Sequence, residues 1–186
     1  SVYGDNINFP LKEIEKLNPK NIYGVSKKLN EYISSYYSTK LSTKFIGMRF
    51  FTIYGEWGRP DMFFLKLFNS ALNNKNFYLN NYGNHFRDFT YIGDVFNLIY
   101  KLIYKSKKKH EIYNFCSDSP INISEIVKKV KKEYKLKVKL APLHKADIIK
   151  THGDNKKIKK YAKFTKYSDW KECIKKLILW YEKDMI

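Results

Sequence analysis

Cysteine is scarce in this chain, and no long apolar run occurs in it. Its 186 residues include two cysteines, Cys116 and Cys173, which lie far apart without CxxC spacing or a neighbouring histidine cluster. A disulfide framework and a metal site are therefore both disfavoured. No apolar run approaches the length of a membrane span, and "SVYGDNINFP" lacks the basic and apolar regions of a signal peptide. We therefore predict a soluble cytoplasmic protein.

The sequence also lacks the glycine-rich turn of a dinucleotide-binding site. Its 8 glycines are scattered and form neither GxGxxG nor GxxGxxG. Such a turn lets backbone amides and a helix N-terminus receive a pyrophosphate. The chain alone is therefore not expected to hold a dinucleotide tightly.

Acidic residues are few compared with basic ones. The chain has 36 Lys and Arg residues but 18 Asp and Glu residues, a formal net charge of +18 at pH 7. A basic surface attracts nucleic acids, but nearly all these residues are lysines scattered through the chain, so we predict no nucleic-acid partner. Only three arginines occur, Arg49, Arg59 and Arg87. Because the rigid guanidinium fork suits phosphate and carboxylate better than lysine does, these positions are candidate sites.

Strand-like and helix-like segments alternate along the chain, which predicts an α/β fold. Apolar residues recur at helical spacing over 23–37, which predicts an amphipathic helix packed on a sheet. "NISEIVKKVKKEY" predicts a helix with Asn122 as its N-cap, and "DWKECIKKLILWYEKDM" a closing helix. "KFIGMRF" and "EIYNFCS" are typical of strands. Pro60 is expected to open a helix over 61–75, and Asp94 to cap another.

Tyr23 and Lys27 stand four residues apart on the first predicted helix and so share one face. An ammonium group near a phenol stabilises the phenolate, which makes the tyrosine a general base at neutral pH. In a chain rich in both residue types, a plain surface pair is the alternative. The setting after "SVYG", within "YGVSK" and before "RFFTIYG" favours catalysis.

These segments, taken in order, resemble the extended short-chain dehydrogenase/reductase family, the NAD-dependent nucleotide-sugar epimerases and dehydratases. The series comprises "SVYG", "YGVSK", "RFFTIYGEWGRPDM", "GNHFRDFTYIGDV", "YNFCSDSPINISEI" and a closing "THGD". It looks most like the UDP-glucuronate 4-epimerases of cell-surface polysaccharide synthesis. The resemblance implies the C-terminal part of a Rossmann-type doubly wound parallel sheet, together with a smaller α/β domain that binds a UDP-sugar.

The resemblance also implies a division of the chain. It places the remainder of the nucleotide-binding domain at about 1–55 and 85–110, and the substrate domain mainly at about 56–84 and 111–186. The GxxGxxG part of relatives precedes "SVYG", so the chain is expected to be a C-terminal fragment. The family's catalytic Ser or Thr also precedes Ser1, which is therefore given no role.

The resemblance assigns catalytic and cofactor roles to the first part of the chain. Tyr23 takes the proton from the sugar 4-hydroxyl while a hydride passes to NAD. Lys27 stabilises the Tyr23 phenolate and hydrogen-bonds the nicotinamide ribose. Hydride return to the opposite face of the 4-keto sugar gives the epimer. Phe50 lies near the nicotinamide or, equally, in the core. Thr52 contacts the sugar carboxylate.

Further roles concern the UDP moiety. Arg87 falls where relatives clamp the diphosphate, and an ion pair with Asp88 is the alternative. Arg59 falls next to the nucleotide-sugar, and Asp147 matches an acidic residue near the ribose. Arg49, at a strand end, is expected to be structural.

The histidines carry weaker expectations. Asp147 is preceded by "HKA", which departs from the relatives and leaves the role of His144 open. His85, His110 and His152 lack the spacing of a metal site or a catalytic triad, so we expect surface or loop residues.

Several alternatives remain from the sequence. Within the family, a 4,6-dehydratase or a UDP-glucuronate decarboxylase is the nearest different reaction. Outside it, a non-catalytic basic binding module is the alternative. Relatives form homodimers through a bundle that includes the Tyr-Lys helix, so a homodimer is expected, and Tyr32 and Tyr36 face either a partner or the core.

We predict that this chain alone binds NAD+ only weakly and has no epimerase activity, because it lacks the glycine-rich turn. Isothermal titration of the chain with NAD+ is expected to show no binding in the micromolar range. A micromolar dissociation constant would contradict this prediction.

Overall fold

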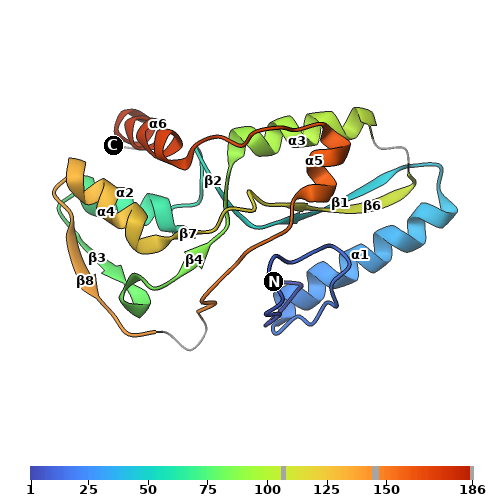
Figure 1. Ribbon diagram of the computed structural model, residues 1–186, viewed down its shortest axis with the longest axis horizontal. Coiled ribbons are helices and arrows are strands. Elements are labelled where there is room, and N and C mark those ends of the chain that lie inside the picture. The colour runs from blue at the N-terminus through green and yellow to red at the C-terminus, as the bar shows by residue number, and fades with distance from the viewer. Residues whose placement is uncertain (106–107, 144–146, 185–186) are drawn as a thin grey trace. The chain divides into compact units, whose positions relative to one another are not determined.

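The structure, a computed structural model, describes residues 1–105, 108–143 and 147–184 (Figure 1). The chain divides into two compact units, each assembled from three separate stretches. The first unit comprises Ser1–Phe51, Val95–Asp118 and His152–Lys166, and the second comprises Thr52–Asp94, Ser119–Thr151 and Tyr167–Ile186.

Helices and strands alternate along the chain, which confirms the α/β class. The helices are α1 (Ile22–Lys40), α2 (Phe63–Leu72), α3 (Ile92–Lys105), α4 (Ile123–Glu133), α5 (Lys156–Ala162) and α6 (Trp170–Asp184), with a 3-10 helix η1 (Asn80–Gly83). The strands are β1 (Phe45–Phe50), β2 (Thr52–Tyr54), β3 (Asn76–Leu79), β4 (Phe86–Arg87), β5 (Phe89–Tyr91), β6 (His110–Phe115), β7 (Ile121–Asn122) and β8 (Lys137–Leu140).

The strands form two-stranded pairs, most of them parallel. β1 pairs with β6, β2 with β5 and β3 with β8 in parallel, whereas β4 and β7 are antiparallel. The β1–β6 register runs from Phe45 opposite His110 to Phe50 opposite Phe115. Parallel pairs need long crossover connections, so each of them joins segments that lie far apart in the sequence.

In the first unit, helices lie on both sides of the β1–β6 pair. α1 and α5 lie on opposite sides of it in Figure 1. Tyr113 and Phe115 of β6 are fully buried, as are Ile158 and Ala162 of α5. We did not predict α5 from the sequence, because its two buried side chains stand among lysines.

α1 buries little of its own surface. Gly24 and Ser38 are its buried residues, whereas Leu29, Tyr32 and Tyr36 are 54%, 63% and 60% exposed. The spacing correctly predicted the helix. The predicted burial of its apolar side chains against a sheet is not found within the described residues, so α1 presents an apolar face to solvent.

Arg49 of β1 forms hydrogen bonds both with α1 and with the N-terminal segment. Its Nε and Nη2 donate to the two carboxylate oxygens of Glu31 at 2.8 Å each. Its Nη1 donates to Tyr3 Oη at 2.9 Å and to the Glu13 carbonyl at 3.0 Å. This bidentate, largely buried pairing agrees with the structural role predicted for Arg49.

The second unit contains the larger apolar core, built from α2, α4, α6 and the strands around them. On α4, apolar side chains at i, i+3, i+4 and i+7 are buried, namely Ile123, Ile126, Val127 and Val130. The helix begins as predicted, because the Ser124 backbone N–H donates to Asn122 Oδ1 at 2.8 Å.

Two predicted helix starts are wrong by a few residues. α2 begins at Phe63, because the backbone of Met62 is still extended, so Pro60 lies in the turn before the helix. Asp94 lies inside the first turn of α3. Its carboxylate there accepts from the backbone N–H and the hydroxyl of Ser168, both at 2.9 Å.

The division into units differs from the boundaries that we predicted. Residues 85–94 fall in the second unit, whereas 111–118 and 152–166 fall in the first. The pairing explains the difference: β4 and β5 pair with β7 and β2 of the second unit. β6 pairs with β1, and α5 packs on β6.

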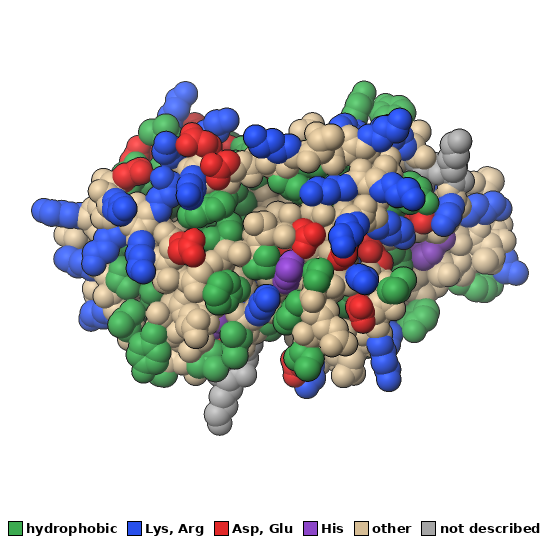
Figure 2. Space-filling model, in the orientation of Figure 1, with side chains coloured by type: hydrophobic (Ala, Val, Ile, Leu, Met, Phe, Trp, Pro, Cys, Tyr) green, Lys and Arg blue, Asp and Glu red, His purple; other side chains and the backbone are tan. Residues whose placement is uncertain are grey.

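The visible surface carries side chains of every chemical type. In Figure 2, Lys and Arg side chains are spread over the visible face among hydrophobic, acidic and neutral ones. Within the described ranges, no helix is long and apolar enough to cross a membrane.

We predict that Leu177→Ala destabilises the second unit by about 2–5 kcal/mol, because Leu177 of α6 is fully buried and its loss leaves a cavity. Urea unfolding followed by tryptophan fluorescence measures the change. Leu179→Ala is the matched control on the same helix, where the side chain is 60% exposed, and it is expected to cost less than about 0.5 kcal/mol. Equal effects of the two substitutions would refute this account of the core.

Candidate functional site

The predicted site residues fall in both units. Tyr23, Lys27 and Phe50 belong to the first unit, and the predicted UDP-sugar residues belong to the second, namely Thr52, Arg59, Arg87 and Asp147.

The start of α1 fixes the position of Tyr23 and Lys27. Asn21 is the N-cap, and its Oδ1 accepts from the Gly24 backbone N–H at 2.8 Å. A Cβ at Gly24 would lie 2.7 Å from the Ser1 carbonyl oxygen and 2.8 Å from Pro19 Cβ. Glycine is therefore the residue that lets this turn approach the N-terminal segment so closely.

Tyr23 and Lys27 lie one turn apart on α1 and are both exposed. Lys27 Nζ lies 5.2 Å from the centre of the Tyr23 ring, a separation typical of a cation over an aromatic ring. The structure therefore brings the ammonium and the phenol together as the spacing predicted. Both groups are accessible to a bound ligand.

Phe50 ends β1, with half of its surface exposed. Its ring meets the Phe115 ring edge-on, with centroids 5.2 Å apart. Phe50 is thus anchored on one side by core packing and open on the other.

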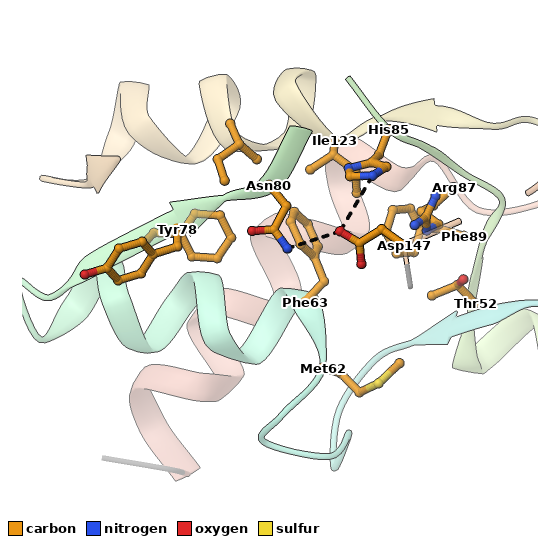
Figure 3. A pocket seen from close by; sticks show the side chains of 12 residues that line it. Thr52, Met62, Phe63, Tyr78, Asn80, His85, Arg87, Phe89, Ile123 and Asp147 are labelled. Atoms are coloured by element: carbon orange, nitrogen blue, oxygen red, sulfur yellow. Dashed lines mark hydrogen bonds and ion pairs between the residues drawn. The ribbon is translucent and has the colours of Figure 1, made fainter. Parts of the chain in front are cut away.

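The second unit contains a cavity of about 320 Å³ (Figure 3). Aromatic and aliphatic side chains form much of its wall, and polar groups enter it from several elements. Its lining comprises Thr52, Met62, Phe63, Phe77, Tyr78, Leu79, Asn80, His85, Arg87, Phe89, Ile123 and Asp147. A mainly apolar pocket with a few convergent polar groups is the usual form of a small-molecule site.

Asp147 stands at the centre of the polar groups (Figure 3). Asn80 Nδ2 donates to its Oδ2 at 3.2 Å, and His85 Nε2 lies 3.9 Å from the same oxygen. Arg87 acts on the carboxylate electrostatically. One carboxylate therefore faces three nitrogen-bearing side chains.

Two backbone carbonyls hold the Arg87 side chain in place. Its Nη1 donates to the carbonyls of Phe86 and Ile149 at 3.1 Å each. Burial lowers the pKa of Arg87, and the Asp147 carboxylate opposes that shift. The guanidinium remains charged at neutral pH, because arginine ordinarily loses its proton only above about pH 12. A fixed, half-buried cation in a cavity is suited to bind an anionic ligand.

A second cavity, of about 200 Å³, adjoins the loop between β2 and α2. Thr52 lines both cavities, and Arg59 lines this one. Arg59 is exposed, and its Nη2 and Nε donate to the Asp61 carboxylate at 2.6 Å and 2.9 Å. The structure thus places Thr52, Arg87 and Asp147 in one cavity and Arg59 in its neighbour.

His85 lies in the loop between η1 and β4, as one of the two expectations had it, but it is not a surface residue: its side chain is buried in the cavity wall, with 6% of its surface exposed. Its place two residues before Arg87 was the only available signal in the sequence, since alternate residues of an extended segment face the same side.

The other described histidines lie outside the cavity lining. His110 begins β6 and contacts Ser34, and His152 Nε2 lies 2.7 Å from Asp118 Oδ1. Among the described residues, no group of three or more His, Cys, Asp or Glu side chains could hold a metal ion. His144 lies outside the described residues.

Known proteins are similar to this chain in sequence and in fold. Residues 1–116 match the NAD dependent epimerase/dehydratase family. An uncharacterized protein of Methanocaldococcus jannaschii is 34% identical over 184 residues, which cover 97% of this chain and 56% of that protein. UDP-glucuronate 4-epimerase 4 of Arabidopsis thaliana is 28% identical over 97% of this chain and 46% of its own length. The chain thus spans about half the length of these relatives.

A solved structure gives the fold. The UDP-glucuronic acid 4-epimerase of Bacillus cereus, in complex with UDP-glucuronic acid and NAD, superposes with a TM-score of 0.87 at 22% identity. The likeness covers 98% of this chain and 59% of that one. It confirms the Rossmann-type α/β fold. With the family match over residues 1–116, the chain belongs to the NAD dependent epimerase/dehydratase family.

Proposed function

We propose that this chain provides the substrate-binding part and the catalytic Tyr-Lys pair of a NAD-dependent 4-epimerase. Its substrate is a UDP-uronic acid, with UDP-glucuronate converted to UDP-galacturonate for cell-surface polysaccharide synthesis. The observation that carries the proposal is the cavity of the second unit, where Thr52, Arg87 and Asp147 converge. The similarity to UDP-glucuronate 4-epimerases supports it.

The polar groups of the cavity match the parts of a UDP-uronic acid. The Arg87 guanidinium binds the diphosphate, because a fixed fork pairs well with phosphate oxygens. The Thr52 hydroxyl donates a hydrogen bond to the sugar carboxylate. Asp147 accepts hydrogen bonds from neutral donors of the nucleoside, since its charge excludes the phosphates. The aromatic walls exclude water and strengthen each of these contacts.

The first unit supplies groups that fit one end of NAD. Tyr23 and Lys27 expose a phenol and an ammonium on one face of α1, both able to bond the hydroxyls of a nicotinamide ribose. The half-exposed ring of Phe50 offers an apolar surface for the nicotinamide. NAD, when bound, supplies a hydride acceptor and later returns the hydride. Tyr23 Oη takes the proton from the sugar 4-hydroxyl and gives it back, and Lys27 stabilises the phenolate between these events.

A second copy of the chain is the partner that we propose for the apolar face of α1. Tyr32 and Tyr36 lie on that face and are exposed. A contiguous apolar stripe of this kind is typical of a surface that another protein covers.

Arg87→Ala is expected to weaken UDP binding by this chain about ten- to one-hundredfold, because a charge-assisted contact to phosphate contributes roughly 1.5–3 kcal/mol. Isothermal titration with UDP measures the change. The control is Lys66→Ala, which removes one exposed positive charge from α2 outside the cavity. Unchanged affinity in the Arg87 variant would refute its role at the diphosphate.

Tyr23→Phe tests the reaction in a protein of the relatives' length that contains this chain. Turnover is expected to fall at least about a hundredfold while UDP-sugar binding is retained, because the phenol hydroxyl is the general base. NMR of the products identifies the reaction, since a 4,6-dehydratase yields a 4-keto-6-deoxy sugar and a decarboxylase yields a pentose. Retained turnover would exclude Tyr23 as the base, and either of those products would exclude the epimerase.

A further inference from the structure

We propose that His85 is a further substrate-recognition residue, which accepts a hydrogen bond from one ribose hydroxyl of the nucleotide while Asp147 accepts one from the neighbouring hydroxyl. The pair would then select ribonucleotides over nucleotides that lack these hydroxyls. This inference rests on the proposed function, because it takes the ligand of the cavity to be a UDP-sugar.

The first observation is an unused hydrogen-bonding atom. His85 Nε2 is buried and has no hydrogen-bond partner among the described residues. The imidazole is already oriented by a hydrogen bond to the Asn80 backbone, which leaves Nε2 to face the cavity. Buried polar atoms are nearly always paired, so a buried nitrogen on a cavity wall indicates a ligand contact.

The second observation is the distance to Asp147. His85 Nε2 and Asp147 Oδ2 lie 3.9 Å apart, too far for a direct hydrogen bond (Figure 3). Both atoms are hydrogen-bond acceptors, because an ionised carboxylate and a ring nitrogen with a lone pair carry no proton. One hydroxyl proton cannot serve both atoms, whereas the neighbouring 2′- and 3′-hydroxyls of a ribose can donate one hydrogen bond to each.

The charges around His85 favour a hydroxyl over a phosphate. Burial and the Arg87 cation lower the pKa of His85, against the opposing effects of Asp147 and the Asn80 backbone. The imidazole is therefore neutral at pH 7, and Nε2 carries a lone pair. An anion placed beside Nε2 would meet the Asp147 carboxylate 3.9 Å away. Two neutral hydroxyls, one donating to each acceptor, satisfy both groups.

The order of residues along the chain matches the order of groups in the ligand. His85 and Arg87 are two residues apart beside β4, and both line the cavity. Two extended residues span about 6.6 Å. In a nucleoside diphosphate, the ribose follows directly after the diphosphate. With Arg87 on the diphosphate, His85 lies where the ribose hydroxyls fall.

The test compares UDP with 2′,3′-dideoxy-UDP, which differs only at the ribose hydroxyls, by isothermal titration of the chain. The unchanged protein is expected to bind UDP at least about tenfold more tightly. His85→Asn retains a group near the ring Nδ1 position for the Asn80 backbone but removes Nε2. It is expected to weaken UDP binding about five- to tenfold, the value of one buried hydrogen bond, and to leave dideoxy-UDP binding within about twofold. His85→Gln, whose amide reaches the Nε2 position, is expected to recover part of the loss.

His110→Asn is the matched control, because His110 belongs to the first unit and contacts Ser34 rather than the cavity. It is expected to change neither affinity. Equal binding of the two nucleotides by the unchanged protein would overturn the inference. The inference would also be overturned if His85→Asn weakened the binding of both nucleotides, which would mark a structural role, or if it weakened the binding of neither. Failure of the unchanged protein to bind either nucleotide would instead contradict the proposed function itself.

Discussion

Backbone hydrogen bonds around Phe86 determine where the recognition groups of the cavity lie. The Phe86 N–H donates to the Ile149 carbonyl at 2.9 Å, and the Thr151 N–H donates to the Phe86 carbonyl at 3.0 Å. On the other side, the Ile123 N–H donates to the His85 carbonyl at 2.9 Å. The short strand β4 is thus held between two segments that are distant in sequence. Because a shift of one residue would turn alternate side chains to the opposite face, this pairing keeps His85 and Arg87 directed into the cavity.

The cavity places the charged Arg87 side chain among apolar walls, and these walls affect both the strength of its contacts and the cost of burying it. Phe63, Phe77 and Phe89 keep the local dielectric low, which strengthens every contact that Arg87 makes with an anion. The same walls would penalise an unpaired cation, but the carbonyls of Phe86 and Ile149 and the nearby carboxylate offset that cost. The Arg87 guanidinium is therefore already oriented before a ligand binds, so binding needs little reorganisation of the second unit.

The sequence predicted the long helices well, because their signals are local. On α4, the Asn122 cap and the four buried apolar positions are all visible in one short stretch. The sequence was less informative where an element depends on a contact with residues far away along the chain. The three-residue strand β2, which follows the predicted strand "KFIGMRF", was not predicted, since it exists by pairing with β5. The burial of His85 was missed for the same reason: its contacts with Asn80 and Asp147 are not visible in the spacing of residues along the chain. The rarity of arginine in a lysine-rich chain marked all three arginines as candidate sites, and of these Arg87 lines the cavity.

The exposed apolar face of α1 has a consequence for the behaviour of the protein in solution. In the homodimer that we propose, apolar contact through this face draws the copies together at short range, whereas a net charge of +18 makes them repel at long range. The repulsion acts over about 10 Å at 0.1 M salt and over about 30 Å at 0.01 M salt. Ionic strength therefore sets the balance, and dilute buffers keep the copies apart. The lysine excess acts as a colloidal stabiliser for a surface that would otherwise promote self-association.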